Sequence, residues 1–229
     1  MIISHRHRFI FLKTEKTASS SLERLFGEIA GEQDTLHPAD SAARRELLRA
    51  NGSLDNASFL AKRGGARRMF PGLSGLHRHA RARDVRAFLG PELFARYTVI
   101  TSERNPFDRQ VSLYSHRQRG KDADLTGFSA SVTSPAYNLL HYNRLDNWGI
   151  YTLDGKVAAH HVIRFESLHD DLAAVLRALG LDPAKHALPH TRQSRTEKSP
   201  AYRELYTDAA RVKVARWYRN EIDHFGYAF

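Results

Sequence analysis

The sequence predicts an α/β fold in a single domain, residues 1–229, with a central, mostly parallel sheet flanked by helices. Apolar runs that suit buried strands alternate with segments of helical periodicity, which is the pattern of a parallel sheet with helical crossovers. Two of the strands, at residues 8–12 and 97–101, lead through a polar turn directly into a helix. The length suffices for one hydrophobic core, and no repeat or change of composition marks a domain boundary.

The first hundred residues are expected to contain two strands and three helices. In chain order, the expected elements are a strand at 8–12, a helix at 18–29, a helix at 41–50, a Gly- and Arg-rich loop at 51–75, a helix at 81–89 and a strand at 97–101. Gly90 is a suitable C-cap for the last of these helices, and Pro91 follows it.

The rest of the chain continues the alternation. In chain order, we expect a helix from Pro106, a polar loop at 120–135, a helix at 137–148, a strand at 162–165, a helix at 168–179 and a helix at 208–223. Pro106 suits the first turn of a helix. The dipeptide Asp154–Gly155 indicates a hairpin turn.

Composition excludes several classes of protein. Hydrophobic residues make up 41% of the chain, but no run approaches the ~20 apolar residues of a membrane span. Residues 1–12 resemble a signal peptide only in part, because Lys13 interrupts the apolar run and no small-residue cleavage site follows. The chain has no cysteine, which excludes disulfides, a thiol nucleophile and a cysteine-based metal site. We therefore expect a cytoplasmic protein without a membrane span.

The formal net charge of +10 predicts attraction to polyanions. A solvated basic surface, nucleic-acid binding, and a cleft for a multiply charged nucleotide or an acidic glycan all agree with this charge. No zinc-finger, bZIP or RNP signature is present, so specific nucleic-acid binding is not expected.

Two polar turns between a strand and a helix have the composition of anion sites. The first, within residues 9–26 (FIFLKTEKTASSSLERLF), carries Lys13, Lys16, Thr17, Ser19, Ser20 and Ser21. The second, within residues 97–114 (YTVITSERNPFDRQVSLY), carries Arg104, Arg109 and Ser112. Helix N-termini favour phosphate and sulfate, although an ordinary N-cap explains the first turn equally well when it is taken alone. Together the two turns predict one ligand with two phosphate-like ends.

These segments resemble those of sulfotransferases that use 3′-phosphoadenosine 5′-phosphosulfate (PAPS). EKTASSSLE, at residues 15–23, is similar to the family's 5′-phosphosulfate loop, PKTAGTSL or RKTASTSLE, and residues 104–114 contain its 3′-phosphate element, RNPxxRxxSxY. HARARDVRAFLG, VIRFESLHDDLAAVLRALGL and the C-terminal region also resemble family segments, in the same order. The resemblance therefore spans nearly the whole chain. It implies a P-loop nucleotide-kinase-like sulfotransferase fold and a bacterial enzyme similar to carbohydrate and membrane-associated sulfotransferases.

The resemblance also implies roles for individual residues. Lys16 is expected to contact the bridging oxygen, where negative charge develops as the product, 3′-phosphoadenosine 5′-phosphate (PAP), leaves. The expected ligands of the phosphosulfate are Lys13, Lys16, Thr17, Ala18, Ser19, Ser20 and Ser21, and those of the 3′-phosphate are Arg104 and Ser112. His79 is the expected catalytic base, with His77 as the alternative. The acceptor is expected to be a carbohydrate, and no metal is expected.

Some assignments stay open on the sequence alone. Arg109 is either a ligand or half of an ion pair with Asp108, Glu103 or another acid. Tyr202 and Tyr206 either contact the adenine or pack against the last helix. The basic segment 190–206 is either a loop that closes over the nucleotide or a solvated one.

Two residues of the first loop depart from the family pattern. Glu15 stands where proline or arginine is common, and Ser19 replaces a frequent glycine. A family member that binds PAP or a polyanion without catalysis is therefore an alternative. A P-loop kinase is another, although the missing GxxxxGK[ST] pattern argues against bound Mg²⁺ and ATP hydrolysis.

Overall fold

The computed structural model describes residues 1–30, 34–36, 78–118, 125–139, 143–188 and 201–229. The chain divides into two compact units: Met1–Glu103 with Gly149–His190, and Arg104–Trp148 with Thr191–Phe229. The helix predicted at 41–50, the loop at 51–75, His77 and most of the basic segment 190–206 lie outside the described residues. The prediction of one domain over residues 1–229 stays a prediction.

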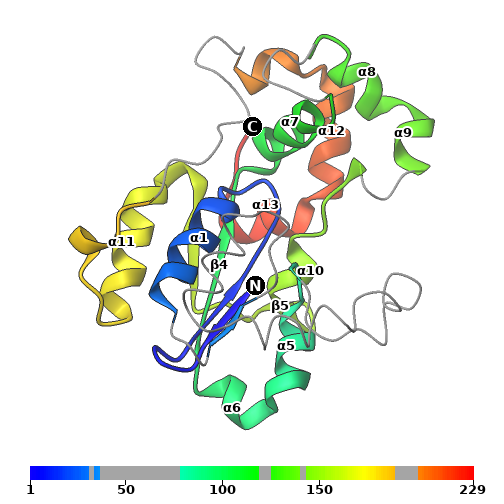
Figure 1. The fold of residues 1–229 in the computed structure, drawn as a ribbon. Helices are drawn as coiled ribbons and strands as arrows, with labels where there is room; N and C mark the ends of the chain where they lie inside the picture. The colour runs from blue at the N-terminus through cyan, green and yellow to red at the C-terminus, as the bar shows by residue number, and fades with distance from the viewer. Residues whose placement is uncertain (31–33, 37–77, 119–124, 140–142, 189–200) are drawn as a thin grey trace. The chain divides into compact units, whose positions relative to one another are not determined.

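The first unit is built on a five-stranded mixed sheet with the strand order β3-β1-β2-β4-β7 (Figure 1). The strands are β1 (Ile2–Ser4), β2 (Phe9–Leu12), β3 (Thr35–Leu36), β4 (Thr98–Glu103) and β7 (His161–Arg164). β2 pairs in parallel with β4, and β4 with β7, whereas β1 is antiparallel to both of its neighbours. The predicted central, mostly parallel sheet flanked by helices is thus confirmed, with β1 as the exception.

Both faces of this sheet are buried, as successive side chains along β2 show. Phe9 and Phe11 of β2 lie on one face, where their rings stand 5.3 and 5.0 Å from the ring of Phe26. Helices α1 (Ser19–Ile29) and α11 (Leu168–Ala178) cover this face. Ile10, which points to the opposite face, is also fully buried. This two-sided burial explains why the strand β2 is apolar throughout rather than alternating.

Short elements complete the first unit. They are α5 (Ala82–Leu89), α6 (Pro91–Ala95), α10 (Trp148–Tyr151), the hairpin of β5 (Thr152–Leu153) and β6 (Lys156–Val157), and the 3₁₀ helices η3 (Phe165–Ser167) and η4 (Pro183–Lys185). Gly90, with φ of 84°, ends α5 as predicted, and Pro91 begins α6. The turn predicted at Asp154–Gly155 is confirmed by the antiparallel pairing of β5 and β6.

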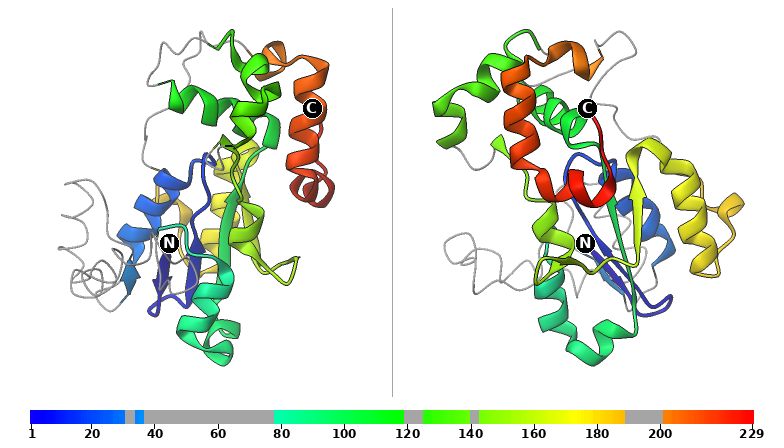
Figure 2. Two further views of the ribbon diagram at one scale, coloured as in Figure 1. Left: turned by 90° about the vertical axis from the view of Figure 1, so that its right-hand side faces the viewer. Right: turned by 180° about the vertical axis from the view of Figure 1, so that it is seen from behind.

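The described part of the second unit is helical. Its elements are α7 (Pro106–Arg117), α8 (Phe128–Thr133), α9 (Pro135–Leu139), η5 (Tyr202–Leu205), α12 (Asp208–Trp217) and α13 (Arg219–Phe225). Figure 2 shows α12 beside α7 and α8, with which it shares a core. Phe107, Phe128, Tyr206 and Phe229 meet edge-to-face in that core, with ring centroids 4.8 to 5.9 Å apart.

Three predictions for the second unit are wrong in part. The helix expected at 208–223 is broken at Tyr218, whose hydroxyl donates to Gln110 at 2.6 Å and accepts from the Leu145 amide at 3.1 Å. Of the helix expected at 137–148, α9 includes residues 137–139, whereas residues 144–147 are not helical. The loop expected at 120–135 contains α8, whose Phe128 and Val132 are buried in the core.

No helix in the described part of the chain is both long and apolar enough to cross a membrane.

Candidate active site

The loop between β2 and α1 has an unusual backbone. Lys16 and Ala18 both have left-handed torsions, with φ of 62° and 58°. For residues with a Cβ this conformation costs roughly 1–2 kcal/mol each. Ser19, where the family pattern often has glycine, does not need a positive φ because it is the first residue of α1. The serine at position 19 therefore adds no backbone strain, and the strained residues are Lys16 and Ala18.

Three fully buried hydroxyls connect this loop to β4. Thr14 donates to the Ser102 carbonyl at 2.6 Å, and its oxygen lies 2.8 Å from the Thr17 hydroxyl and 3.0 Å from the Ser102 hydroxyl. The Thr17 and Ser102 hydroxyls are 2.8 Å apart. Ser19 donates to the Thr14 carbonyl. The hydroxyls of Thr17 and Ser19 thus bind atoms of the protein, and their predicted role as phosphate ligands stays a prediction.

Lys13, which directly follows β2 at the start of the loop, forms a buried ion pair. Its side chain is 2% exposed, and its ammonium group binds the Glu23 carboxylate of α1. It also donates to the Ser20 hydroxyl at 3.2 Å. Two further cations approach the same carboxylate, the α-amino group of Met1 at 3.3 Å and Arg78 at 3.9 Å. The charge of Lys13 is therefore compensated inside the protein, while Lys16 is partly exposed.

His79 belongs to the same loop region, although 66 residues separate it from Lys13. Its Nδ1 lies 2.8 Å from the Lys13 carbonyl, and because a carbonyl can only accept, Nδ1 carries the hydrogen and Nε2 the lone pair. Burial lowers the pKa of His79 to about 4. The hydrogen bond to the Lys13 carbonyl opposes this shift, whereas nearby cations, including Lys13 and Arg78, lower the pKa further. At neutral pH the ring is therefore uncharged and able to accept a proton at Nε2.

The second predicted anion element lies at the start of α7 in the other unit. Arg104 is mostly buried, and its Nε and Nη2 donate to one oxygen of Asp108 at 2.8 and 2.5 Å. Asn105 caps the helix by accepting from the Phe107 amide at 3.0 Å. Ser112 is buried two turns into α7. The ion pair with Asp108 restricts the guanidinium group of Arg104.

Arg109 is half of a structural ion pair. It is fully buried, donates to Glu221 of α13 at 2.9 Å and lies over the Tyr218 ring, 4.5 Å from its centroid. The sequence allowed an ion pair but pointed to nearby acids, and the actual partner is 112 residues away. Tyr206 also has a structural position, because its hydroxyl donates to the Phe107 carbonyl at 2.9 Å. Tyr202 packs against the same core.

Thr14, Glu23 and Ser102 are the residues around the loop that sequence reasoning missed. Each is polar yet lies in or beside an apolar segment: Thr14 and Ser102 at the carboxyl ends of two predicted strands, and Glu23 between Leu22 and the rest of an apolar helix face. A polar residue at such a position usually has a buried partner, and this is the signal that could have found them.

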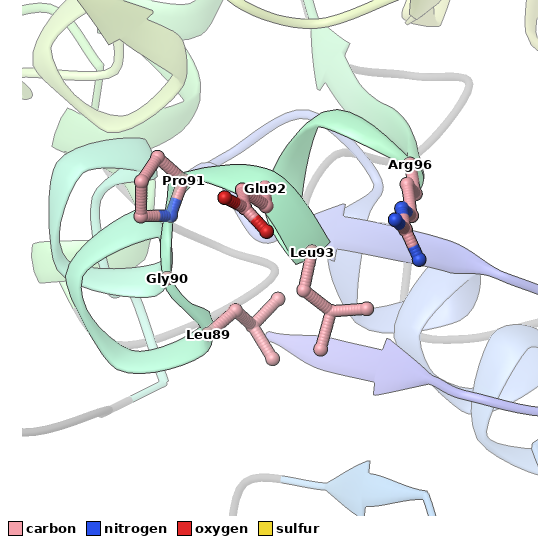
Figure 3. A pocket seen from close by; sticks show the side chains of 6 residues that line it. All are labelled: Leu89, Gly90, Pro91, Glu92, Leu93 and Arg96. Atoms are coloured by element: carbon pink, nitrogen blue, oxygen red, sulfur yellow. The ribbon is translucent and has the colours of Figure 1, made fainter.

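A surface pocket of about 290 Å³ lies elsewhere in the first unit. Figure 3 shows it at the junction of α5 and α6, lined by Leu89, Gly90, Pro91, Glu92, Leu93 and Arg96. These residues precede β4, whereas the loop of Lys16 follows the carboxyl end of β2, and β2 and β4 are parallel and in register. The pocket is therefore at the other end of these strands from the loop. Among the described residues, no three His, Asp or Glu side chains form a group that could hold a metal.

Comparison with known proteins gives one match. The model of a family described as the sulfotransferase family matches residues 1–228. No curated protein and no solved structure matches the chain.

Proposed function

The chain belongs to the sulfotransferase family, which implies a transferase, and from this premise we propose that it moves a sulfuryl group from PAPS to an acceptor hydroxyl or amine. Under this proposal the chain adopts the P-loop-like sulfotransferase fold as one domain. In-line transfer of this kind depends mainly on positioning and on stabilising the charge that develops on the leaving oxygen.

The observation that supports the proposal most is the shape of the loop before α1. Left-handed residues at Lys16 and Ala18 turn the main chain so that successive N–H groups can converge, as in the anion-binding nests of phosphate sites. The loop leads into the positive end of an 11-residue helix. A phosphosulfate has the charge and the acceptor oxygens that such a loop requires. In our proposal Lys16 supplies the positive charge at the bridging oxygen, and residues 17–21 bind the 5′-phosphosulfate.

His79 has the properties of a general base. The hydrogen bond to the Lys13 carbonyl fixes the ring with its lone pair on Nε2, and the low pKa keeps it unprotonated at neutral pH. A bound anion would raise this pKa and so strengthen the base once the donor is present. We propose that Nε2 removes the proton of the acceptor. His77 lies outside the described residues and remains the alternative.

Arg104 and Ser112 are the proposed ligands of the 3′-phosphate. A guanidinium group forms bidentate hydrogen bonds with phosphate. The hydrogen bonds to Asp108 limit the rotation of the Arg104 guanidinium group. For the acceptor we propose a carbohydrate, in keeping with the sequence resemblance to glycan sulfotransferases and with the net charge of +10, which favours acidic glycans. The cytoplasmic location expected from the sequence stays a prediction.

Transfer from ³⁵S-labelled PAPS to a panel of glycans, small alcohols and a tyrosine peptide tests this function. Labelling of a glycan by the wild type is expected, with a loss of about 100-fold in turnover for Lys16→Ala. Alanine and lysine adopt a left-handed backbone at a similar cost, so the thermal midpoint of Lys16→Ala should equal that of the wild type. The exposed Lys156 provides the control, because Lys156→Ala should keep full turnover. Near-normal turnover by Lys16→Ala would contradict the role of Lys16, and labelling of the peptide alone would contradict a carbohydrate acceptor.

A further inference from the structure

We propose that Thr14 and Ser102 are positioning residues, which hold Lys16 and Ala18 in their left-handed conformations through the hydroxyl of Thr17. We call Thr14, Thr17 and Ser102 the hydroxyl cluster. The inference rests on the proposed function, because it concerns the loop that would bind the phosphosulfate. Neither Thr14 nor Ser102 has been given a role by the resemblance to sulfotransferases.

The hydroxyl cluster is placed where it can control the loop. Thr17 stands between the two left-handed residues, so fixing its side chain constrains the main chain on both sides. Its hydroxyl lies 2.8 Å from each of the other two hydroxyls, one at the start of the loop and one on β4. On the far side of Ala18, the hydroxyl of Ser19 binds the Thr14 carbonyl. Left-handed residues with a Cβ persist only where their surroundings fix them, and these contacts provide that constraint.

The three hydroxyls of the cluster have few other hydrogen-bond partners available. Thr14 gives its one hydroxyl hydrogen to the Ser102 carbonyl, so its oxygen can only accept from Thr17 or Ser102. All three side chains have no exposed surface, so water has no access to replace a lost partner. Removing the Ser102 hydroxyl therefore deprives both Thr14 and Thr17 of a partner. The loop would then relax towards negative φ at Lys16 and Ala18, and its main chain would lose the left-handed shape on which the proposed anion site depends.

Glycine provides a specific test, because it adopts positive φ without a steric cost. If Ser102→Ala allows the loop to relax, Ala18→Gly should help to restore the left-handed form. The gain in PAP affinity from Ala18→Gly should therefore be larger in the Ser102→Ala background than in the wild type. A hydroxyl that only adds stability would give the same gain in both backgrounds.

The experiment is a double-mutant cycle of Ser102→Ala and Ala18→Gly, measured by PAP calorimetry and by thermal unfolding. We expect Ser102→Ala to weaken PAP binding about tenfold and Ala18→Gly to recover at least half of that loss on a logarithmic scale. If Ser102→Ala does not fold, the isosteric Thr14→Val replaces it, with Thr14→Ser as the variant that retains the hydroxyl. Equal effects of Ala18→Gly in both backgrounds would overturn the proposal.

Two matched variants control the cycle. Thr101→Val removes another buried hydroxyl of β4, which binds the Leu12 carbonyl at 3.0 Å and not the loop, so it should show no coupling to Ala18→Gly. Asp154→Gly relaxes another left-handed residue, with φ of 51°, in the β5–β6 turn, and should show no coupling to Ser102→Ala.

The thermal data separate this proposal from the proposed function. Ala18→Gly relieves strain only while the loop is held left-handed, so it should raise the thermal midpoint more in the wild type than in Ser102→Ala. If the wild type binds no PAP, the proposed function fails, but this difference in midpoint still tests the hydroxyl cluster. Equal midpoint shifts overturn it in that case too.

Discussion

His79 shows at the scale of single residues how the fold sets the charge of a side chain. Burial lowers the pKa of His79 from 6.5 to about 4 in the folded protein. The unfolded chain therefore takes up a proton at this position as the pH falls below about 6.5, while the folded chain resists until about 4. Stability is thus lost as the pH falls through this window, and it is fully present above it.

His79→Gln should reduce this pH dependence. The free energy of unfolding should fall in both proteins as the pH is lowered from 7 to 4. We expect this decrease to be smaller in His79→Gln than in the wild type, by up to about 3 kcal/mol. Urea unfolding at several pH values measures the difference, with the exposed His169→Gln as the control. An unchanged pH profile in His79→Gln would show that the ring is not buried in its neutral form.

At pH 7 the same variant should keep PAP affinity and lose transfer, and normal turnover would redirect the search to His77.

Glu23 is predicted to be structural at the same scale. Its carboxylate compensates Lys13 in a site where both side chains are buried, so Glu23→Gln leaves a buried ammonium group without its counter-charge. The expected loss is about 3–5 kcal/mol in the free energy of unfolding. The double variant Lys13→Met/Glu23→Leu should recover only part of it, because the buried α-amino group of Met1 still lacks the Glu23 carboxylate. Glu28→Gln on the same helix, whose exposed carboxylate pairs with Arg24, should change stability by less than about 1 kcal/mol. Equal losses in the two single variants would contradict the buried pair.

At the scale of elements, the sequence was most reliable where strand and helix have strong local signals. The predicted strand 8–12 and helix 18–29 differ by one residue at their starts from β2 and α1, because apolar periodicity and the polar turn mark both. The sequence failed where contacts between distant residues contribute to an element. β1 is only three residues long and pairs with two antiparallel partners. At the break after α12, Tyr218 donates a hydrogen bond to Gln110, which is far away in the sequence.

The candidate site shows the same division. The sequence singled out the loop residues and His79 as candidates by type and position, and their roles stay predictions. It did not predict the left-handed backbone at Lys16 and Ala18. It also missed Ser102 and Glu23, because their roles arise from partners that folding brings together across strands and helices. Spacing along the chain cannot reveal such pairs.

The ion pair of Arg109 and Glu221 joins α7 to α13 and gives a prediction at this scale. Arg109→Met should lower the free energy of unfolding by about 3–5 kcal/mol, because it leaves the Glu221 carboxylate buried without its partner. The double variant Arg109→Met/Glu221→Leu should be more stable than either single variant. Chemical denaturation measures this, and Arg219→Met, which breaks an exposed pair with Asp223, is the control. A double variant that keeps stability but loses PAP binding would mean that Arg109 is a ligand after all.

At the scale of the whole molecule, the net charge of +10 allows two explanations for anion binding. A diffuse basic surface would bind ATP, duplex DNA and PAP alike, with a steep dependence on salt. A donor site would select PAP through its two phosphates, which the family membership and the sequence both favour. Selectivity therefore separates a sulfotransferase from a general polyanion binder.

The most direct test is calorimetric titration of the purified chain with PAP, using ATP and duplex DNA as competitors. We expect selective PAP binding that Arg104→Ala weakens by about 10- to 100-fold, since it removes charge-assisted hydrogen bonds to the 3′-phosphate. Arg216→Ala removes an exposed arginine of α12 and should leave the affinity unchanged. Absence of PAP binding by the folded chain, or equal binding of all three polyanions, would contradict our proposal that this protein is a PAPS-dependent sulfotransferase.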